Sequence, residues 1–323
     1  MHWLLGARRL KQLGILGMNR RNATCILDHN PRRLFPLVDD KIRLQQLCCR
    51  IGVPTPAVFD VIEYHSSLRK LPEILGKRAD FVIKPNCGSA GRGVLVVTGQ
   101  TGPDYLRHNG EKIRLEAIRQ HLSDILSGMY SLGGRPDQAI LQQRVRLHPA
   151  FQAISWQGIP DIRIVLYRNK PAMAMLRLPT KESNGRANLH QGGIGTGIDL
   201  ATGITHHAVQ RNRFIERHPD TGKAVTGMSV PYWGEVLGMS EKVAAAVGLG
   251  YLGVDIVIDA ESGPLLLEAN ARPGLAIQIA NGRGLVPQLQ AIDNEMSSET
   301  IPAPGEPEEK RRAREHELVR QSA

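Results

Sequence analysis

The sequence has few of the residues that several classes of protein need in quantity. It contains only four cysteines, Cys25, Cys48, Cys49 and Cys87. None has CxxC spacing, which argues against a disulfide framework or a zinc site and favours a reducing, cytoplasmic environment. Aromatic residues make up 4% of the chain, and no nucleic-acid-reading module is recognisable, so nucleic-acid binding is the least favoured alternative. No apolar run approaches the roughly 18 residues of a membrane span, so we expect a soluble protein.

The composition otherwise suits a globular protein with a sizeable core. The chain has 323 residues, of which 41% are apolar, and a formal net charge of +10. Most of this surplus lies in residues 1–50, which hold ten Lys or Arg and three Asp. Two interpretations stay open, a solvated basic helix and loop or a surface for an acidic partner.

Hydrophobic periodicity places the main elements. Residues 14–36 are expected to be irregular, and a helix follows, capped by Asp39 or Asp40, with apolar residues at helical spacing and an end at Gly52. Strands are expected over the following ranges: 81–84, 93–97, 139–145, 161–167, 171–178, 254–258 and 265–270. The polar, glycine-rich stretch 180–197 is expected to be a long mobile loop, of a length that is uncommon unless the loop has a function.

The sharpest local motif follows the strand that ends at Lys84. Three glycines and a serine come between this lysine and the next strand: Gly88, Ser89, Gly91 and Gly93. Glycines let the backbone approach a polyanion, their N–H groups can bind phosphate oxygens, and the lysine adds a positive charge. The motif is not a Walker A loop, because no Gly-Lys-Ser/Thr follows and the next element is a strand. Taken alone, it is equally compatible with a plain hairpin turn.

A second motif lies on the last two strands. Side chains alternate along a strand, so Glu268 and Asn270 share a face, and a hairpin would bring Asp255 beside them. Two carboxylates and an amide oxygen are the hard ligands that Mg²⁺ prefers. The alternative is three polar residues on the outer face of a hairpin. Arg272 adds a cation where phosphoryl charge would develop.

Other polar residues carry less information. Gly248–Gly253 matches GxGxxG, but it follows a helix and precedes a strand, which is the reverse of the dinucleotide-binding order. Asp161 and Arg163 share a strand face, and Arg177, Asn188 and His190 follow; each on its own is more typical of a surface than of a site.

Taken together, the order of these segments resembles the ATP-grasp superfamily, in particular its alpha-L-glutamate ligase-like branch, related to the enzymes that add glutamate to a ribosomal protein. The resemblance covers about Leu13 to Leu289. It is carried by the segments Asp40-Lys41, Gly52–Pro56, Phe81–Gly93, Ile140–Val145, Asp161–Arg163, Asn188–Gly193, Gly253–Asp255 and Glu268–Gly274.

The resemblance implies an α+β fold in which two α+β subdomains grip ATP. The expected divisions are a short basic segment (1–38), subdomain A with the glycine loop 88–93 (39–138), subdomain B with the metal and substrate site (139–296) and a disordered charged tail (297–323). Fewer than forty residues precede Asp40. Relatives have a full pre-ATP-grasp domain there, so we expect a truncated N-terminal region and an acceptor site that is open or completed by another subunit, in a homo-oligomer or with a partner.

The resemblance also implies roles for individual residues. Lys41 and Lys84 would contact the ATP phosphates, and the loop Ser89–Gly93 would close over them. Gln143, Arg144 and Val145 would lie against the adenine, although relatives usually have a glutamate where Gln143 stands. Asp255, Glu268 and Asn270 match the cluster that holds two Mg²⁺ ions, with Mn²⁺ as a substitute. The remaining matches would hold substrate and the transferring phosphoryl group: Arg163, Arg177, Asn188, His190 and Arg272.

The implied activity is an ATP- and Mg²⁺-dependent carboxylate–amine ligase that forms an amide through an acyl phosphate and adds glutamate or another amino acid to a peptide, protein or small acceptor. Such chemistry depends on positioning and charge neutralisation, which fits the lack of a Ser/His/Asp set. Arg272 stands where close glutamate-ligase relatives have a small residue, which leaves the use of glutamate open. The alternative is an ATP-grasp phosphotransferase or a nucleotide-binding protein without ligase activity.

Overall fold

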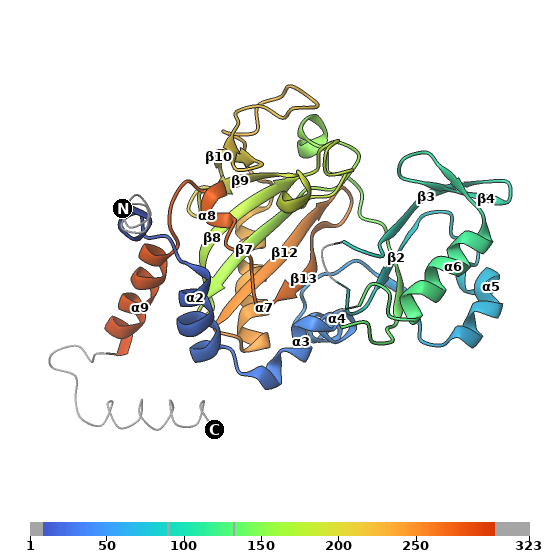
Figure 1. Cartoon of the computed structure of the whole chain (residues 1–323), viewed down its shortest axis with the longest axis horizontal. Coiled ribbons are helices and arrows are strands. Elements are labelled where there is room, and N and C mark those ends of the chain that lie inside the picture. The colour runs from blue at the N-terminus through green and yellow to red at the C-terminus, as the bar shows by residue number, and fades with distance from the viewer. Residues whose placement is uncertain (1–8, 89–90, 132, 301–323) are drawn as a thin grey trace, which may run out of the picture.

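The computed structural model describes residues 9–88, 91–131 and 133–300, and the predicted phosphate-loop residue Ser89 lies outside them. Two antiparallel sheets form the framework, as expected for the α+β class (Figure 1). In the described part of the chain, no helix is long and apolar enough to cross a membrane.

The first sheet has six strands in the order β1-β6-β2-β3-β4-β5. Its strands are β1 (Val58–Ile62), β2 (Phe81–Pro85), β3 (Leu95–Thr101), β4 (Asp104–Arg107), β5 (Lys112–Ile113) and β6 (Ala139–Gln142). The expected hairpin is confirmed, because β2 and β3 pair with Phe81 opposite Val97. Strand β6, which we had expected beyond the end of subdomain A at residue 138, lies inside this sheet between β1 and β2.

Helices cover one face of the first sheet. They are η3 (His65–Lys70), α5 (Leu71–Leu75) and α6 (Leu115–Leu126). Ile118, Leu122 and Ile125 repeat at helical spacing on α6 and are fully buried against Phe81 and Ile83 of the sheet. This apolar stripe explains why α6 forms where it does.

The second sheet has seven strands in the order β11-β10-β9-β8-β7-β12-β13. Its strands are β7 (Asp161–Tyr167), β8 (Lys170–Leu178), β9 (Ile194–Ile198), β10 (Thr205–Gln210), β11 (Arg213–Phe214), β12 (Tyr251–Asp259) and β13 (Gly263–Asn270). Every residue of β12 is buried, because the sheet is covered on both faces.

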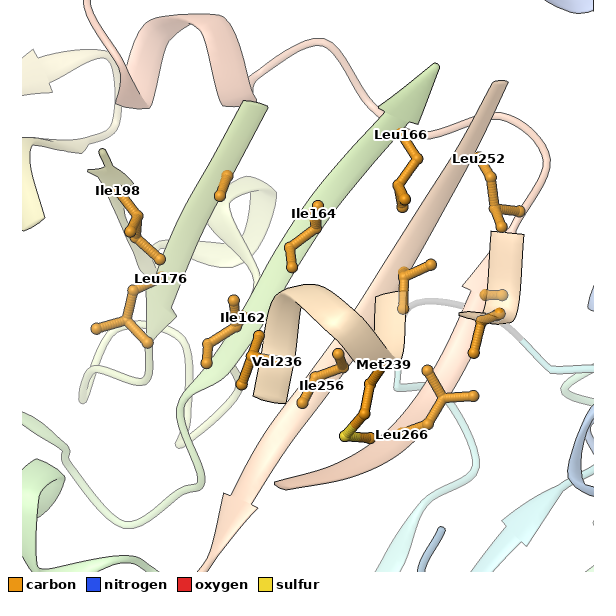
Figure 2. Close-up of a cluster of buried hydrophobic side chains, with 14 of the residues drawn as sticks. Ile162, Ile164, Leu166, Leu176, Ile198, Val236, Met239, Leu252, Ile256 and Leu266 are labelled. Atoms are coloured by element: carbon orange, nitrogen blue, oxygen red, sulfur yellow. The ribbon is translucent and has the colours of Figure 1, made fainter. Parts of the chain in front are cut away.

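Helix α7 (Trp233–Val247) covers one face of this sheet. Val236 of the helix lies beside Ile162 of the strands, and Met239 beside Ile256 and Leu266, in a continuous apolar layer (Figure 2). Helix α4 (Lys41–Arg50) adds Leu44, Leu47 and Cys48 to the same core. The predicted cap of α4 is confirmed, since Asp40 Oδ1 accepts from the Arg43 N–H at 2.9 Å.

The opposite face, called the site face below, is covered by segments from both ends of the chain. They are α2 (Met18–Arg20), η1 (Arg21–Leu27), α8 (Ile277–Ala280) and α9 (Val286–Thr300). Leu16, Cys25 and Ile26 pack with Ile277 and Leu285 against this face. The N-terminal region continues through η2 (Arg32–Leu34) and α3 (Pro36–Asp39) to α4. Short helices η4 (Pro149–Ile154) and η5 (Leu189–Gln191) complete the described elements.

Two predictions about elements are wrong. Residues 14–36 are not irregular, because α2 and η1 form a helical segment whose Cys25 and Ile26 are buried. The stretch 180–197 is not one long loop, because its last residues begin β9, a fully buried strand inside the sheet. In addition, α9 continues to Thr300, past residue 297, where we had expected the tail to begin.

Candidate functional site

A cavity of about 390 Å³ opens on the site face of the second sheet. Its walls come from α3 and α4, the start of the glycine loop, strands β7, β8 and β13, and the segments before η5 and after β13. Nine residues named from the sequence line it: Lys41, Gly88, Arg163, Arg177, Asn188, His190, Glu268, Asn270 and Arg272. Segments that are far apart in the sequence therefore meet at this cavity.

Strand register explains why the acidic residues meet. Asp255 on β12 lies directly opposite Glu268 on β13 and Arg163 on β7, so the three side chains share the site face. Arg163 donates from Nε to Asp255 Oδ1 at 2.7 Å and from Nη2 to Asp255 Oδ2 at 2.5 Å. Arg177 Nη2 donates to the same Oδ2 at 2.7 Å.

Asp255 is 3% exposed, so its charge is stabilised by these two guanidinium groups and not by water. Burial alone would raise the pKa of Asp255, but Arg163 and Arg177 hold that pKa well below its usual range. Arg177 also forms a two-pronged ion pair with Asp161, its neighbour across β7 and β8. Two buried arginines thus balance two buried aspartates.

Glu268 has a different environment from Asp255. Its side chain is 38% exposed, and Arg163 Nη2 lies 3.9 Å from its Oε1. Burial and the charge of Asp255 raise the pKa of Glu268. Glu268 lines the cavity, and a cation beside it would stabilise its charge against the repulsion from Asp255.

The residues present fit a magnesium ion. Glu268 and Asn270 lie on one face of β13 and both line the cavity, and their oxygens are hard ligands. Asn270 Oδ1 accepts from the Arg272 N–H at 2.8 Å and retains a second lone pair. Among the described residues, no three His, Cys, Asp or Glu side chains form a metal cluster, so the site depends on the Asn270 amide together with two carboxylates.

Two lysines face this group from α4 and β2. Burial and the nearby Lys41 lower the pKa of Lys84 to about 7, and Glu268 partly offsets this effect. Lys84 and Glu268 are therefore electrostatic neighbours, although one lies on each sheet. Lys41 Nζ donates to the carbonyl oxygens of Gly88 at 2.7 Å and Asn86 at 3.2 Å, so in this structure it holds the start of the glycine loop.

The glycine loop is anchored at both ends. Asp137 accepts from the Cys87 N–H at 3.0 Å and from the Ser131 hydroxyl at 2.6 Å. Gly91 and Gly93 have φ values of +68° and +73°, and a Cβ on Gly93 would lie 2.6 Å from the Tyr130 ring. Only glycine suits Gly93, both for backbone conformation and for space. The sequence did not single out Asp137, because its link to the loop is a contact across 50 residues.

The substrate residues named from the sequence lie at other walls of the cavity. Asn188 Oδ1 caps η5 by accepting from the His190 N–H at 3.0 Å, and both residues line the cavity. Arg272 lines the wall nearest α3, with its guanidinium 4.7 Å from the centre of the Phe35 ring.

The three residues expected at the adenine do not line this cavity. Gln143 Oε1 accepts from the Ala57 N–H, Arg144 forms a two-pronged ion pair with Asp80, and Val145 is buried against Val257 and Leu265. A second cavity, lined by Lys84, Ile140, Gln142 and Leu267 among others, lies between the two sheets. It has only about 20 Å³, and Gln143, Arg144 and Val145 do not line it either.

Solved structures with a similar course of the chain include several ligases. The ATP-grasp ligase PsnB complexed with a minimal precursor is 18% identical over 82% of this chain and 63% of that chain, with a TM-score of 0.43. D-cycloserine synthetase DcsG is 15% identical over 82% and 72%, with a TM-score of 0.45. A RimK domain ATP-grasp protein from Sphaerobacter thermophilus is 14% identical over 81% and 70%, also with a TM-score of 0.45. The chain thus spans less than two thirds of the length of PsnB.

No curated protein gives a significant match to the sequence. A family profile does: the one described as sugar-transfer associated ATP-grasp matches residues 20–294. This range contains both sheets and every residue that lines the cavity. The predicted membership of the ATP-grasp superfamily is therefore confirmed, and the chain belongs to the sugar-transfer associated ATP-grasp family.

Proposed function

We propose that the protein is an ATP- and Mg²⁺-dependent ligase that joins a carboxylate to an amine. One observation supports this function best: Glu268 and Asn270 share a cavity with Lys41 and Gly88 of the glycine-loop region, and Lys84 is electrostatically coupled to Glu268. A cation and loop backbone suited to phosphates thus share one space with the Glu268 carboxylate and the Asn270 amide, two oxygen ligands suited to magnesium.

The roles divide by the chemistry of each side chain. Lys41, Lys84 and the backbone of the glycine loop would bind the phosphates of ATP. Asp255, Glu268 and Asn270 would hold Mg²⁺, and Mn²⁺ could replace it at the same oxygens. When bound, the metal neutralises charge on the phosphates. Arg163 and Arg177 fix the Asp255 carboxylate in place, so we assign them a positioning role in place of the substrate contact that the resemblance implies.

The proposed reaction has two steps. A substrate carboxylate oxygen attacks the γ-phosphorus of ATP, the bond from this phosphorus to the β–γ bridging oxygen breaks, and ADP leaves. The amine nitrogen then attacks the carbonyl carbon of the acyl phosphate, the carbon–oxygen bond to phosphate breaks, and the amine loses a proton. No protein nucleophile is required, so the residues act by orientation and charge stabilisation.

An acyl phosphate must be protected from water. We assign this task to the stretch 180–193, whose Asn188 and His190 line the cavity, and to the glycine loop, whose first residue Gly88 lines it as well. We infer that the chain divides into two units around the nucleotide, with β6 leading from the first sheet toward the second. We further propose that an amino acid such as glutamate is one substrate and that a peptide, a protein or a small molecule is the acceptor.

The test is a coupled assay with the full chain, ATP, Mg²⁺ and panels of carboxylates and amines. The panels should contain amino acids, peptides and, because of the family description, amino sugars. We expect ADP release that requires both substrates, with a product whose mass equals their sum minus water. ADP release without an amine, accompanied by a phosphorylated product, would favour the phosphotransferase alternative. Nucleotide binding without ADP release under any condition would favour a binding protein.

The proposed metal site is tested with a variant in which one proposed metal ligand is replaced. Glu268→Gln retains the size of the side chain but removes one carboxylate charge from the edge of the cavity. We expect turnover to fall by at least about 100-fold, because charge stabilisation at the phosphoryl group is lost. Wild-type turnover in this variant would contradict the proposed metal site.

A further inference from the structure

The cavity holds three arginines, and they are not equally available to a ligand. Arg163 and Arg177 use their Nε and Nη2 groups on Asp255 and Asp161. These two arginines are nearly buried, with side chains 13% and 11% exposed. Their charges are balanced inside the protein, so neither is a free receptor for a substrate anion.

Arg272 differs from Arg163 and Arg177 in the exposure of its side chain and in the groups that its guanidinium contacts. Its side chain is exposed at the cavity wall, and no carboxylate lies within ion-pair distance of its guanidinium in the part of the chain that the structure describes. The guanidinium lies over the Phe35 ring, a contact that uses the flat face of the group. The N–H donors at its edge remain available, in a geometry that matches a carboxylate with two parallel hydrogen bonds.

The backbone around Arg272 is fixed from three sides. Asn270 Oδ1 accepts from the Arg272 N–H, Asn30 Nδ2 donates to the Ala271 carbonyl at 3.1 Å, and Arg21 Nη1 donates to the Pro273 carbonyl at 3.1 Å. The N-terminal segment therefore supports the loop that carries Arg272, and it also supplies the Phe35 ring. An exposed side chain on such a fixed loop is preorganised for a ligand.

We propose that Arg272, oriented by Phe35, binds a carboxylate of the amine substrate and thereby selects an amino acid over a simple amine. This inference rests on the proposed ligase function and names the class of amine substrate that the site takes. It assigns Arg272 to recognition of the amine substrate and not to binding of the transferring phosphoryl group. Phe35 is a positioning residue, because it acts through Arg272 and does not itself line the cavity.

Binding measurements test the proposal without requiring turnover. The full chain, saturated with ADP and Mg²⁺, is titrated by calorimetry with L-glutamate and with its α-carboxamide, which differ only in the α-carboxylate. We expect wild type to bind glutamate about 10- to 100-fold more tightly than the amide, as for loss of a charge-assisted hydrogen-bonded pair. Arg272→Gln should bind both weakly and equally, and Arg272→Lys should keep a small preference, because lysine lacks the planar fork.

Further variants separate recognition from general disruption. Phe35→Leu should reduce the preference for glutamate several-fold, and Phe35→Tyr should restore it, because tyrosine keeps the aromatic face. Arg283→Gln, at an exposed arginine outside the cavity lining, should leave the preference unchanged. Thermal unfolding of each variant monitors the fold.

The outcomes distinguish this inference from the proposed function. Equal binding of the two probes by wild type, no binding of either probe, or an unchanged preference in Arg272→Gln would overturn the role of Arg272. A preference that depends on Arg272, together with no ADP release from ATP in any assay, would support the carboxylate site and contradict the ligase activity.

Discussion

Asp255 and Glu268 lie opposite each other on adjacent strands, but their environments differ in a way that separates stability from activity. Asp255 is buried and receives hydrogen bonds from two arginines, whereas Glu268 is partly exposed and its pKa is raised by burial and by Asp255. The first carboxylate is needed to balance buried charge, and the second, which we propose as a metal ligand, would be stabilised by a cation. We expect substitutions at the two positions to have different effects.

Asp255→Asn should destabilise the protein by about 3–5 kcal/mol, because it leaves Arg163 with only the more distant Glu268 and Arg177 with only Asp161. The neutral amide is nearly the same size, so the loss reflects charge and not packing. Urea unfolding of the metal-free chain measures the free energy of unfolding. Glu268→Gln is the control and should unfold at the same or a slightly higher urea concentration. Equal losses in the two variants would contradict the division of roles.

The lowered pKa of Lys84 predicts that nucleotide binding is accompanied by the uptake of a proton. Its pKa is lowered to about 7 by burial and by Lys41, and phosphates placed beside it would raise that pKa. Above pH 7 the free lysine is largely neutral, so binding must take up a proton. This contribution to affinity is complete below pH 7 and is lost as the pH rises toward the pKa of the bound state.

Calorimetry at pH 8 in two buffers with different ionisation enthalpies gives the number of protons taken up. We expect about one proton per nucleotide at pH 8 and close to none at pH 6. Lys84→Arg, which stays charged at both pH values, should bind without this uptake at pH 8. The same uptake in Lys84→Arg and wild type would assign the proton to another group.

At the level of elements, the strongly patterned segments could be predicted and the glycine-rich ones could not. The hairpin of β12 and β13 and the capped helix α4 follow from apolar periodicity and turn residues. Strand β9 has glycines at Gly195 and Gly197 that imitate a loop, yet these glycines are required by packing. A Cβ on Gly197 would lie 2.7 Å from the Ala280 carbonyl oxygen, because α8 approaches the strand closely.

The site was predictable to a similar degree. Residues on paired strands could be brought together from alternation alone, as for Asp255 with Glu268. The ion pairs of Arg163 and Arg177 depend on the order of β8, β7 and β12 in the sheet, which sequence spacing does not reveal. Phe35 was missed for the same reason, since its contact with Arg272 joins residues 237 positions apart along the chain.

A pair of glycine substitutions tests the packing of β9. Gly197→Ala should destabilise the protein by about 1–3 kcal/mol, because the backbone of Ala280 must move. Gly238→Ala on α7 should stabilise it by about 0.5–1 kcal/mol, because a Cβ there meets nothing within 4 Å and alanine favours a helix. Thermal unfolding of both variants shows whether each substitution lowers or raises the stability of the protein. A neutral Gly197→Ala would indicate that β9 and α8 pack loosely.

At the scale of the molecule, the two sheets are connected by a short path beside the region expected for adenine. After β6 ends at Gln142, the Arg146 N–H donates to Asp259 Oδ2 at 2.7 Å, which ties the connecting segment to the second sheet. The Leu266 N–H of β13 donates to the Pro54 carbonyl oxygen at 2.9 Å, so the segment that precedes β1 also contacts the second sheet. Leu266 also lines the cavity of about 20 Å³, whereas the cavity of about 390 Å³ is lined by Gly88 of the glycine loop, where we propose that the phosphates bind.

This asymmetry predicts that the two parts of ATP bind by different routes. Tripolyphosphate with Mg²⁺ should enter the existing cavity directly, so its observed binding rate should rise linearly with concentration. We expect the adenine to enter between the sheets and the sheets to separate to admit it, so the observed rate for ATP should reach a plateau set by that motion. Stopped-flow fluorescence measures both, with the signal from Trp156 and Trp233. A linear dependence for ATP up to high concentration would mean that the adenine site is open in solution.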